Sequence, residues 1–236
     1  MQSLKEQFSE YKYKIELHAH TKPASPCSEV TSERLVSAYA DLGVDGVAIT
    51  NHFVDYVIGN QDKNTFCDNY LKDFYNAKNA GERLGVKVYL GMEVRFPEYC
   101  NDYLVFGVDE NDVRQVFSYI FGDYISFYKA FKNDKNVIIQ AHPFRDNMVL
   151  QSDEYLDGIE VFNMSKGHNS RNELSKSYAD ARPKFIKTCG SDFHREGDEG
   201  RGIILTKTLP DDSFGLAEIL KKRDYLFCIE DSIIIP

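Results

Sequence analysis

Short runs of β-branched and aromatic residues alternate along this chain with longer segments whose apolar residues recur three or four positions apart. The short runs are typical of buried strands, and the longer segments are typical of amphipathic helices. We expect strands at residues 13–17, 46–50, 87–91, 103–108, 137–140, 158–162, 185–188 and 202–205. We expect helices at residues 32–42, 65–84, 110–117, 125–133, 170–181 and 214–222.

This alternation predicts an α/β fold with a parallel sheet, most simply closed as a barrel. An open doubly wound sheet is the alternative, but the chain has neither the G-x-G-x-x-G motif nor the P-loop that mark its usual nucleotide site. No Pro/Gly/Ser-rich linker, low-complexity tract or repeat divides the 236 residues. We therefore expect a single domain over residues 1–236.

Composition and charge exclude several classes of protein. The chain has no run of eighteen apolar residues, so no membrane span is predicted. The N-terminal residues mix both charge signs and lack the apolar core of a secretory signal. The net charge of −9 disfavours a stable complex with duplex nucleic acid. Five cysteines without a C-x-x-C pair predict neither a disulfide framework nor a zinc finger. These features predict a cytoplasmic protein with no membrane partner and leave its oligomeric state open.

Five of the six histidines and two carboxylates directly follow predicted strands. The carboxyl ends of barrel strands form the rim where such folds build active sites, and residues two apart in extended chain share one face. So many polar groups meeting at one rim would be costly to desolvate without a partner. Imidazoles with carboxylates suit Zn, Mn or Fe. The residues concerned are His18, His20, His52, Glu93, His142, Asp192 and His194.

The order H-x-H, T-[D/N]-H, G-x-E, H-P and G-S-D-x-H resembles that of the PHP domain, named for polymerase and histidinol phosphatase, from His18 to His194. The resemblance implies a distorted (β/α)7 TIM-like barrel, two or three divalent metal ions and phosphoester hydrolysis. It implies that Glu93 bridges two ions. It also implies that the ligands are His18, His20, His52, Glu93, His142, Asp192 and His194.

The chain departs from this pattern at three places. Where many members have a histidine after H-x-H, it offers Cys27, which is either a zinc ligand or a buried structural thiol. Near the fourth strand it has no histidine, and only Asp109 could substitute. Asn51 stands where T-D-H has its aspartate, which changes the surroundings of His52. Two ions are expected, and the third depends on these positions.

Two divalent ions about 3.5–4 Å apart can clamp a phosphate oxygen, activate a water and stabilise a leaving alkoxide. Arg95, Arg145 and Arg195 follow predicted ligands closely and could bind the phosphate, the alternative being surface ion pairs. His168 follows the sixth strand and could contact the substrate or protonate the leaving group, or be an exposed loop residue.

We therefore predict a metal-dependent phosphoesterase that acts on a small phosphorylated metabolite or nucleotide through a metal-activated water. An amidohydrolase-type C–N hydrolase is one alternative, although residues 103–108 lack the lysine it usually needs. A non-catalytic metal-binding regulatory module is the other. The substrate is not predicted, and its specificity is expected to reside in residues 54–64, 98–102 and 146–153. With no further domain attached, polymerase association is not expected.

Overall fold

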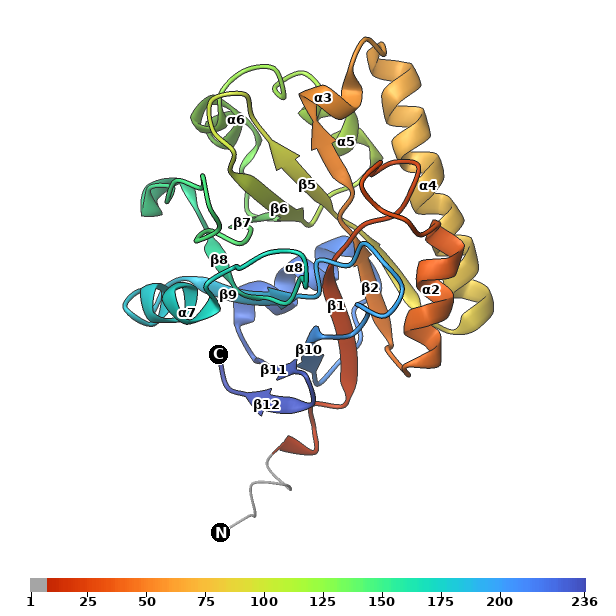
Figure 1. Ribbon diagram of the computed structural model, residues 1–236, viewed down its shortest axis with the longest axis vertical. Helices are drawn as coiled ribbons and strands as arrows, with labels where there is room; N and C mark the ends of the chain where they lie inside the picture. The colour runs from red at the N-terminus through yellow and green to blue at the C-terminus, as the bar shows by residue number, and fades with distance from the viewer. Residues whose placement is uncertain (1–7) are drawn as a thin grey trace.

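The computed structural model describes residues 8–236 of the chain. Part of the N-terminus that is predicted not to be a secretory signal, residues 1–7, lies outside the described residues. Two six-stranded sheets form the centre of the described structure, and helices cover them (Figure 1). None of the helices in the described part combines the length and apolarity that a membrane crossing requires.

Both sheets are mixed. The first has the strand order β12 (Ser232–Ile234), β11 (Tyr225–Ile229), β10 (Gly202–Thr206), β1 (Tyr13–Ala19), β2 (Gly46–Ile49) and β4 (Lys87–Leu90). The second has the order β3 (His52–Val54), β5 (Met92–Arg95), β6 (Asp102–Phe106), β7 (Val137–Gln140), β8 (Gly158–Asn163) and β9 (Ile186–Gly190). A parallel bridge between Ala19 and Phe193 joins the end of β1 to the chain that follows β9.

All eight predicted strands are present, but the prediction of a parallel sheet is wrong. β1 pairs antiparallel with β10, and β6 pairs antiparallel with both β5 and β7. Only residues 96–101 connect β5 to β6, whereas a parallel crossover needs a dozen residues or more. The closed barrel is not confirmed either, since the described strands do not form one closed sheet. The single domain remains a prediction.

The six predicted helices are present, and the short helix α3 was not predicted. Asp62 caps the start of α4 by accepting hydrogen bonds from two backbone amides, and Gly85 ends it with a left-handed φ of 76°. α2 packs against α4 along one side of the molecule (Figure 1). The helices are α2 (Ser32–Asp41), α3 (Asp55–Ile58), α4 (Lys63–Leu84), α5 (Glu110–Val116), α6 (Tyr124–Phe131), the 3-10 helix η1 (Asp153–Tyr155), α7 (Asn172–Asp180) and α8 (Ser213–Lys222).

A continuous apolar core fixes the strands that carry the polar residues of interest. In β1, Ile15, Leu17 and Ala19 are fully buried, and in β6 the side chains of Leu104 and Phe106 are fully buried too. Burying a side chain of this size stabilises the fold by roughly 1.5–3 kcal/mol. Packing of the core therefore fixes the backbone at the strand ends, and the polar side chains there project from rigid positions.

Candidate metal centre

The end of β1 places two imidazoles together. His18 and His20 are both fully buried, and their Nε2 atoms lie 3.0 Å apart. Residues two apart on a strand project from the same face, which explains why the H-x-H spacing brings both rings to one place. Two buried ring nitrogens at this distance either share a proton or bind a common partner.

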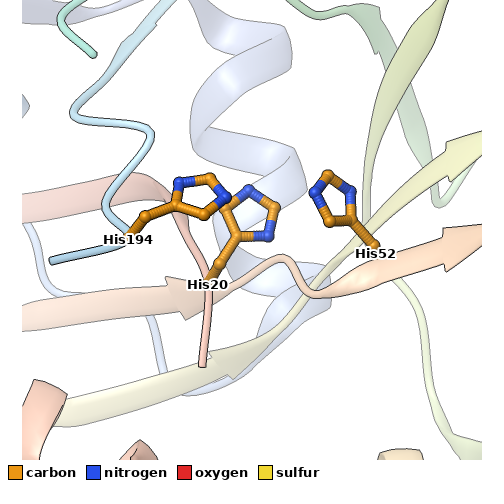
Figure 2. A group of neighbouring side chains, drawn as sticks. All are labelled: His20, His52 and His194. Atoms are coloured by element: carbon orange, nitrogen blue, oxygen red, sulfur yellow. The ribbon is translucent and has the colours of Figure 1, made fainter. Parts of the chain in front are cut away.

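A second feature of the cluster is a group of three imidazoles from distant segments. The ring of His20 lies 4.4 Å from that of His52 and 4.3 Å from that of His194, centroid to centroid. Figure 2 shows the three rings gathered at one point, with His52 projecting from the start of β3. One donor nitrogen from each residue lies within 4.8 Å of the others. Three imidazoles at such distances can hold one metal ion.

His18, His142 and Asp192 form another such group, again with donor atoms within 4.8 Å of one another. His142 and Asp192 both have positive φ angles, of 29° and 50°. Neither residue is a glycine, and each such conformation costs on the order of 1–3 kcal/mol. Backbone strain at two predicted ligands is characteristic of a functional site held in place by the surrounding fold.

The carboxylate of Glu93 lies between these two groups. Its Oε1 is 3.3 Å from His18 Nε2 and 3.1 Å from His142 Nε2. Its Oε2 is 2.8 Å from His52 Nδ1 and 3.4 Å from His20 Nε2. Each oxygen thus faces a different pair of imidazoles, which is the arrangement that a bridging carboxylate requires.

The charges of the cluster are strongly coupled. Burial raises the pKa of Glu93, but His18 and His52 outweigh it and hold that pKa well below its usual value. Burial likewise opposes the ionisation of Asp192, whose pKa is nevertheless held well below its usual value by His18 and by a hydrogen bond from His20. Burial, together with His194 and His52, lowers the pKa of His20 well below its ordinary value, which favours a neutral ring with a free lone pair.

Several buried polar atoms of the cluster have no hydrogen-bond partner among the described residues, namely His52 Nδ1, Glu93 Oε2 and His142 Nδ1. His52 Nδ1 and Glu93 Oε2 are close enough for an ion pair, yet their angles do not allow a hydrogen bond. Each unsatisfied buried atom costs about 1–3 kcal/mol. A divalent cation would satisfy the orphaned atoms that face the cluster, and the nitrogen and carboxylate donors suit Zn, Mn or Fe. The residues therefore fit a metal.

Asp102 is a candidate ligand that sequence reasoning missed. Its carboxylate, together with Glu93 and His142, forms a further group of donor atoms within 4.8 Å. Asp109, the expected substitute near the fourth strand, instead caps α5 by accepting hydrogen bonds from two backbone amides. The physical reason is the direction of β6: because this strand is antiparallel to β5, its first residue pairs with Arg95, and the carboxylate of Asp102, not the segment after the strand, comes near Glu93.

Cys27 is exposed, so the expectation of a buried structural thiol is wrong. Burial of the sulfur atom alone would raise its pKa, but hydrogen bonds from His194 and His52 lower it to about 6. The side chain therefore lies beside two of the three imidazoles in the group around His20. Its role as a metal ligand remains a prediction.

The cluster opens into a pocket of about 540 Å³, which Arg95, Arg145, Arg195 and His168 all line. Arg95 binds both carboxylate oxygens of Asp102, at 2.7 and 2.6 Å. Arg195 forms an exposed ion pair with Glu29 at 2.8 Å. Burial and the nearby Arg145 lower the pKa of His168. All four residues therefore border the pocket, and their roles toward a substrate remain predictions.

Asn51 also has a clear structural role. Its Oδ1 accepts hydrogen bonds from the backbone amide of Thr21 and from Ser25 Oγ, and its Nδ2 donates to Asp73 Oδ2 at 3.0 Å. An aspartate at position 51 would place a second carboxylate against Asp73 and would lack the donor. The asparagine thus fits a neighbouring acid, and it positions the loop that follows His20.

Three buried polar residues behind the cluster were also missed: Glu16, Glu160 and Asn163. A sequence signal existed for the two acids, because each stands inside an otherwise apolar strand, in K-I-E-L and G-I-E-V-F. A charged residue is almost never fully buried without a partner. Each of them was therefore a candidate for a specific polar contact.

The protein has a mixed α/β fold in which a cluster of buried imidazoles and carboxylates lies beneath an open pocket. This arrangement defines a class of proteins built around a candidate metal centre. The chain belongs to the PHP domain family, whose sequence pattern matches residues 16–221.

Similar proteins include the PolC-type DNA polymerase III of Streptococcus mutans, 28% identical over 144 residues, which cover 61% of this chain and 9% of the polymerase. That of Oceanobacillus iheyensis is 24% identical over 188 residues, covering 68% and 12%. The chain spans about a tenth of the length of these relatives.

Solved structures that share the fold include the following two. One is a two-domain protein from Bacteroides vulgatus that contains a predicted PHP-like metal-dependent phosphoesterase. It has a TM-score of 0.66 and 18% identity, and the match covers 94% of this chain and 66% of that one. The other is a proposed metal-dependent phosphoesterase from Bifidobacterium adolescentis, with a TM-score of 0.52, 19% identity and coverage of 87% and 95%.

Proposed function

We propose that this protein is a metal-dependent phosphoesterase that hydrolyses a small phosphorylated metabolite or nucleotide. The observation that carries the proposal is the position of Glu93, with each oxygen facing a different pair of imidazoles beneath an open pocket. Membership of the PHP domain family supports the same reading. Two or three ions of Zn, Mn or Fe would complete the site.

The residues divide between two adjacent positions. His20, His52 and His194 would hold one ion, and His18, His142 and Asp192 would hold another, with Glu93 shared. Cys27 would add a donor to the first position, and Asp102 offers one beside Glu93 and His142. Ions bound in this way supply Lewis acidity toward a phosphoryl oxygen and lower the pKa of a water.

The chain's own groups would orient the substrate. Arg145 lies in the pocket wall with 12% of its side chain exposed, so its guanidinium can meet a phosphate oxygen while it still holds Asp192. His168 lies at the same wall and could give a proton to the leaving oxygen from its ring nitrogen. Arg195 lies further out, with 64% of its side chain exposed.

The pocket also bears on the alternatives. Amidohydrolase chemistry usually needs a lysine at the metals, and no lysine is among the described residues that line this pocket. A metal centre that only stabilised the fold would not need a pocket of about 540 Å³ beside its ligands. Both features favour hydrolysis of a phosphoester.

The test combines elemental analysis of the purified protein with a substrate panel. The panel contains sugar phosphates, amino-alcohol phosphates, nucleoside bisphosphates, short oligonucleotides and, as controls, amides and cyclic ureides. We expect about two divalent ions per chain and metal-dependent release of phosphate or nucleotide. Hydrolysis of the amides alone would overturn the proposal in favour of an amidohydrolase, and bound metal without any hydrolysis would favour a regulatory module.

A further inference from the structure

Glu160 is a buried carboxylate that contacts the cluster from behind. It lies in β8 with 1% of its surface exposed. Its Oε1 is 2.9 Å from His18 Nδ1, on the side of the ring that faces away from Glu93 and His20. Its Oε2 accepts hydrogen bonds from the backbone amide of His142 at 3.0 Å and from Asn163 Nδ2 at 2.9 Å.

These contacts determine where the proton of His18 lies. An ionised carboxylate only accepts hydrogen bonds, so Nδ1 of His18 must be the donor in this pair. In the neutral ring, which is the form that binds a metal, the single proton then lies on Nδ1, and Nε2, which points toward Glu93 and His20, presents its lone pair. We propose that Glu160 is a positioning residue that holds His18 in this form and thereby sets the metal affinity of the site. The proposal rests on the metal centre of the proposed function.

The packing of β9 supports this role independently. Gly190 passes directly behind the pair: a Cβ atom at this position would lie 2.4 Å from His18 Cβ and 2.9 Å from Glu160 Oε1. The backbone of β9 therefore packs closely against both side chains, with no space for a side chain at position 190. A contact confined by backbone on one side and by buried hydrogen bonds on the other is preorganised before any ligand arrives.

The influence of Glu160 extends to a second predicted ligand. Asn163 donates to Glu160 through Nδ2, while its Oδ1 accepts a hydrogen bond of 2.6 Å from Arg145 Nη2. The same Nη2 atom lies 2.5 Å from Asp192 Oδ2. Asn163 Nδ2 also lies 3.3 Å from Asp192 Oδ2, so one carboxylate outside the ligand set orients His18 directly and Asp192 through Asn163 and Arg145.

The direct test is Glu160→Gln, which conserves the shape of the side chain. The amide oxygen must stay with His142 N and Asn163 Nδ2, so the amide nitrogen faces His18 Nδ1. His18 must then accept at Nδ1 and carry its proton on Nε2, where it blocks a metal. We expect zinc affinity, measured by competition with a chromophoric chelator, to fall about 10- to 100-fold.

Glu16→Gln is the matched control. Glu16 is an equally buried carboxylate in β1. Its Oε1 accepts from the backbone amides of Leu17, His18 and Ser191, which an amide oxygen can also accept, and its Oε2 accepts from Tyr39 Oη; neither oxygen bonds to an imidazole ring. We expect its zinc affinity to equal that of the wild type. Circular dichroism and melting temperature establish that each variant is folded. Equal losses in both variants would show that general destabilisation is the cause and would overturn the proposal.

A second measurement needs no variant. In zinc-loaded wild-type protein labelled with ¹⁵N-histidine, the ring nitrogens of His18 should show a protonated Nδ1 and a zinc-bound Nε2. Zinc on Nδ1, or wild-type affinity in folded Glu160→Gln, would overturn the proposal. If the wild type binds none of zinc, manganese and iron, both this proposal and the metal centre fail. If it binds zinc as described but hydrolyses no phosphoester, only the proposed activity fails.

Discussion

Arg145 and Asp192 form a largely buried ion pair in which Nη2 of the arginine lies 2.5 Å from Oδ2 of the aspartate. The other carboxylate oxygen, Oδ1, lies 3.4 Å from Nε2 of His18 and 3.4 Å from Nε2 of His20. The arginine therefore decides which oxygen of Asp192 faces the imidazoles. Arg145, which is expected to bind the substrate, thus also holds the predicted metal ligand Asp192. Its removal should therefore affect both catalysis and metal binding.

Arg145→Ala is expected to lower kcat/KM for the best phosphoester by about 10- to 100-fold, because charge-assisted hydrogen bonds contribute roughly 1.5–3 kcal/mol each. Metal affinity should fall as well, since Asp192 Oδ2 loses its contact with the guanidinium of Arg145.

Arg95→Ala should act similarly by freeing Asp102. Arg195→Ala, which breaks only an exposed pair with Glu29, serves as the control with little effect. Steady-state kinetics with metal analysis would check this; wild-type efficiency in both Arg145→Ala and Arg95→Ala would rule out the phosphate clamp.

Glu93→Gln should empty or weaken the metal site. The amide keeps one oxygen but removes the negative charge that faces four imidazoles, so the affinity should fall by more than the roughly 10- to 100-fold that follows loss of an outer partner. Elemental analysis after dialysis against a weak chelator measures the change. Asp109→Asn, which preserves a helix cap away from the cluster, should keep the wild-type content. Full occupancy in Glu93→Gln would refute the bridging role.

Cys27→Ser tests whether Cys27 is a metal ligand. If the sulfur donates to the ion near His52 and His194, the hydroxyl is a poorer donor for zinc, and zinc affinity should fall by roughly 10-fold or more while the melting temperature of the metal-free protein stays level. Cys100→Ser is the control, because Cys100 is also exposed and lines the same pocket. Zinc titrations and melting curves on the same samples decide; equal zinc affinity in the two variants would exclude Cys27 as a ligand.

Asp73→Asn should be tolerated and should become relatively more stabilising as the pH rises. Burial raises the pKa of Asp73 above 3.8, against hydrogen bonds from Thr21 and Asn51 that an amide oxygen can also accept. A raised folded-state pKa means that the protonated form is favoured. The wild type therefore loses stability as the pH rises from below 3.8 through the raised value, on the order of 1 kcal/mol per pKa unit.

Urea unfolding at several pH values between 3.5 and 7 checks the prediction for Asp73. The difference in unfolding free energy between Asp73→Asn and the wild type should shift toward the variant with rising pH, then level off. A difference that moved the other way would show that the ionised carboxylate, not its burial, is what the fold requires at this position.

The strand ends that carry the predicted ligands could be predicted because, at each, a short apolar run is followed directly by a histidine or an acid. Apolar runs mark β1, β2, β7 and β9, and polar histidines or acids stand immediately after the apolar residues. The short strands β3 and β5 were not predicted, since the backbone passes from one sheet to the other within one or two residues, with no change of composition. Strand direction is also not encoded in such runs.

The residues behind the ligands were harder to find for a different reason. Glu160 and Asn163 act through partners that are distant in sequence, such as His18 and Arg145, and no local spacing reveals these pairs. Asp102 was missed because its position depends on the antiparallel direction of β6. Local pattern therefore predicts which residues can bind a metal, whereas the contacts that orient them require the tertiary structure.

The antiparallel β6 also separates two loops that evolution can alter independently. The connection 96–101 opens at the mouth of the pocket, where Arg95, Cys100 and Asp102 are found. The turn at the opposite end is tied to α8, because the backbone amide of Gly107 donates to Ser213 Oγ. Insertions among the exposed residues 97–100 of the first loop would change which molecules enter the pocket and would keep the scaffold intact. Insertions in the second loop would disrupt packing without changing selectivity. Paralogues that diverge in substrate are thus expected to vary in length at 96–101 and to be uniform at 107–109.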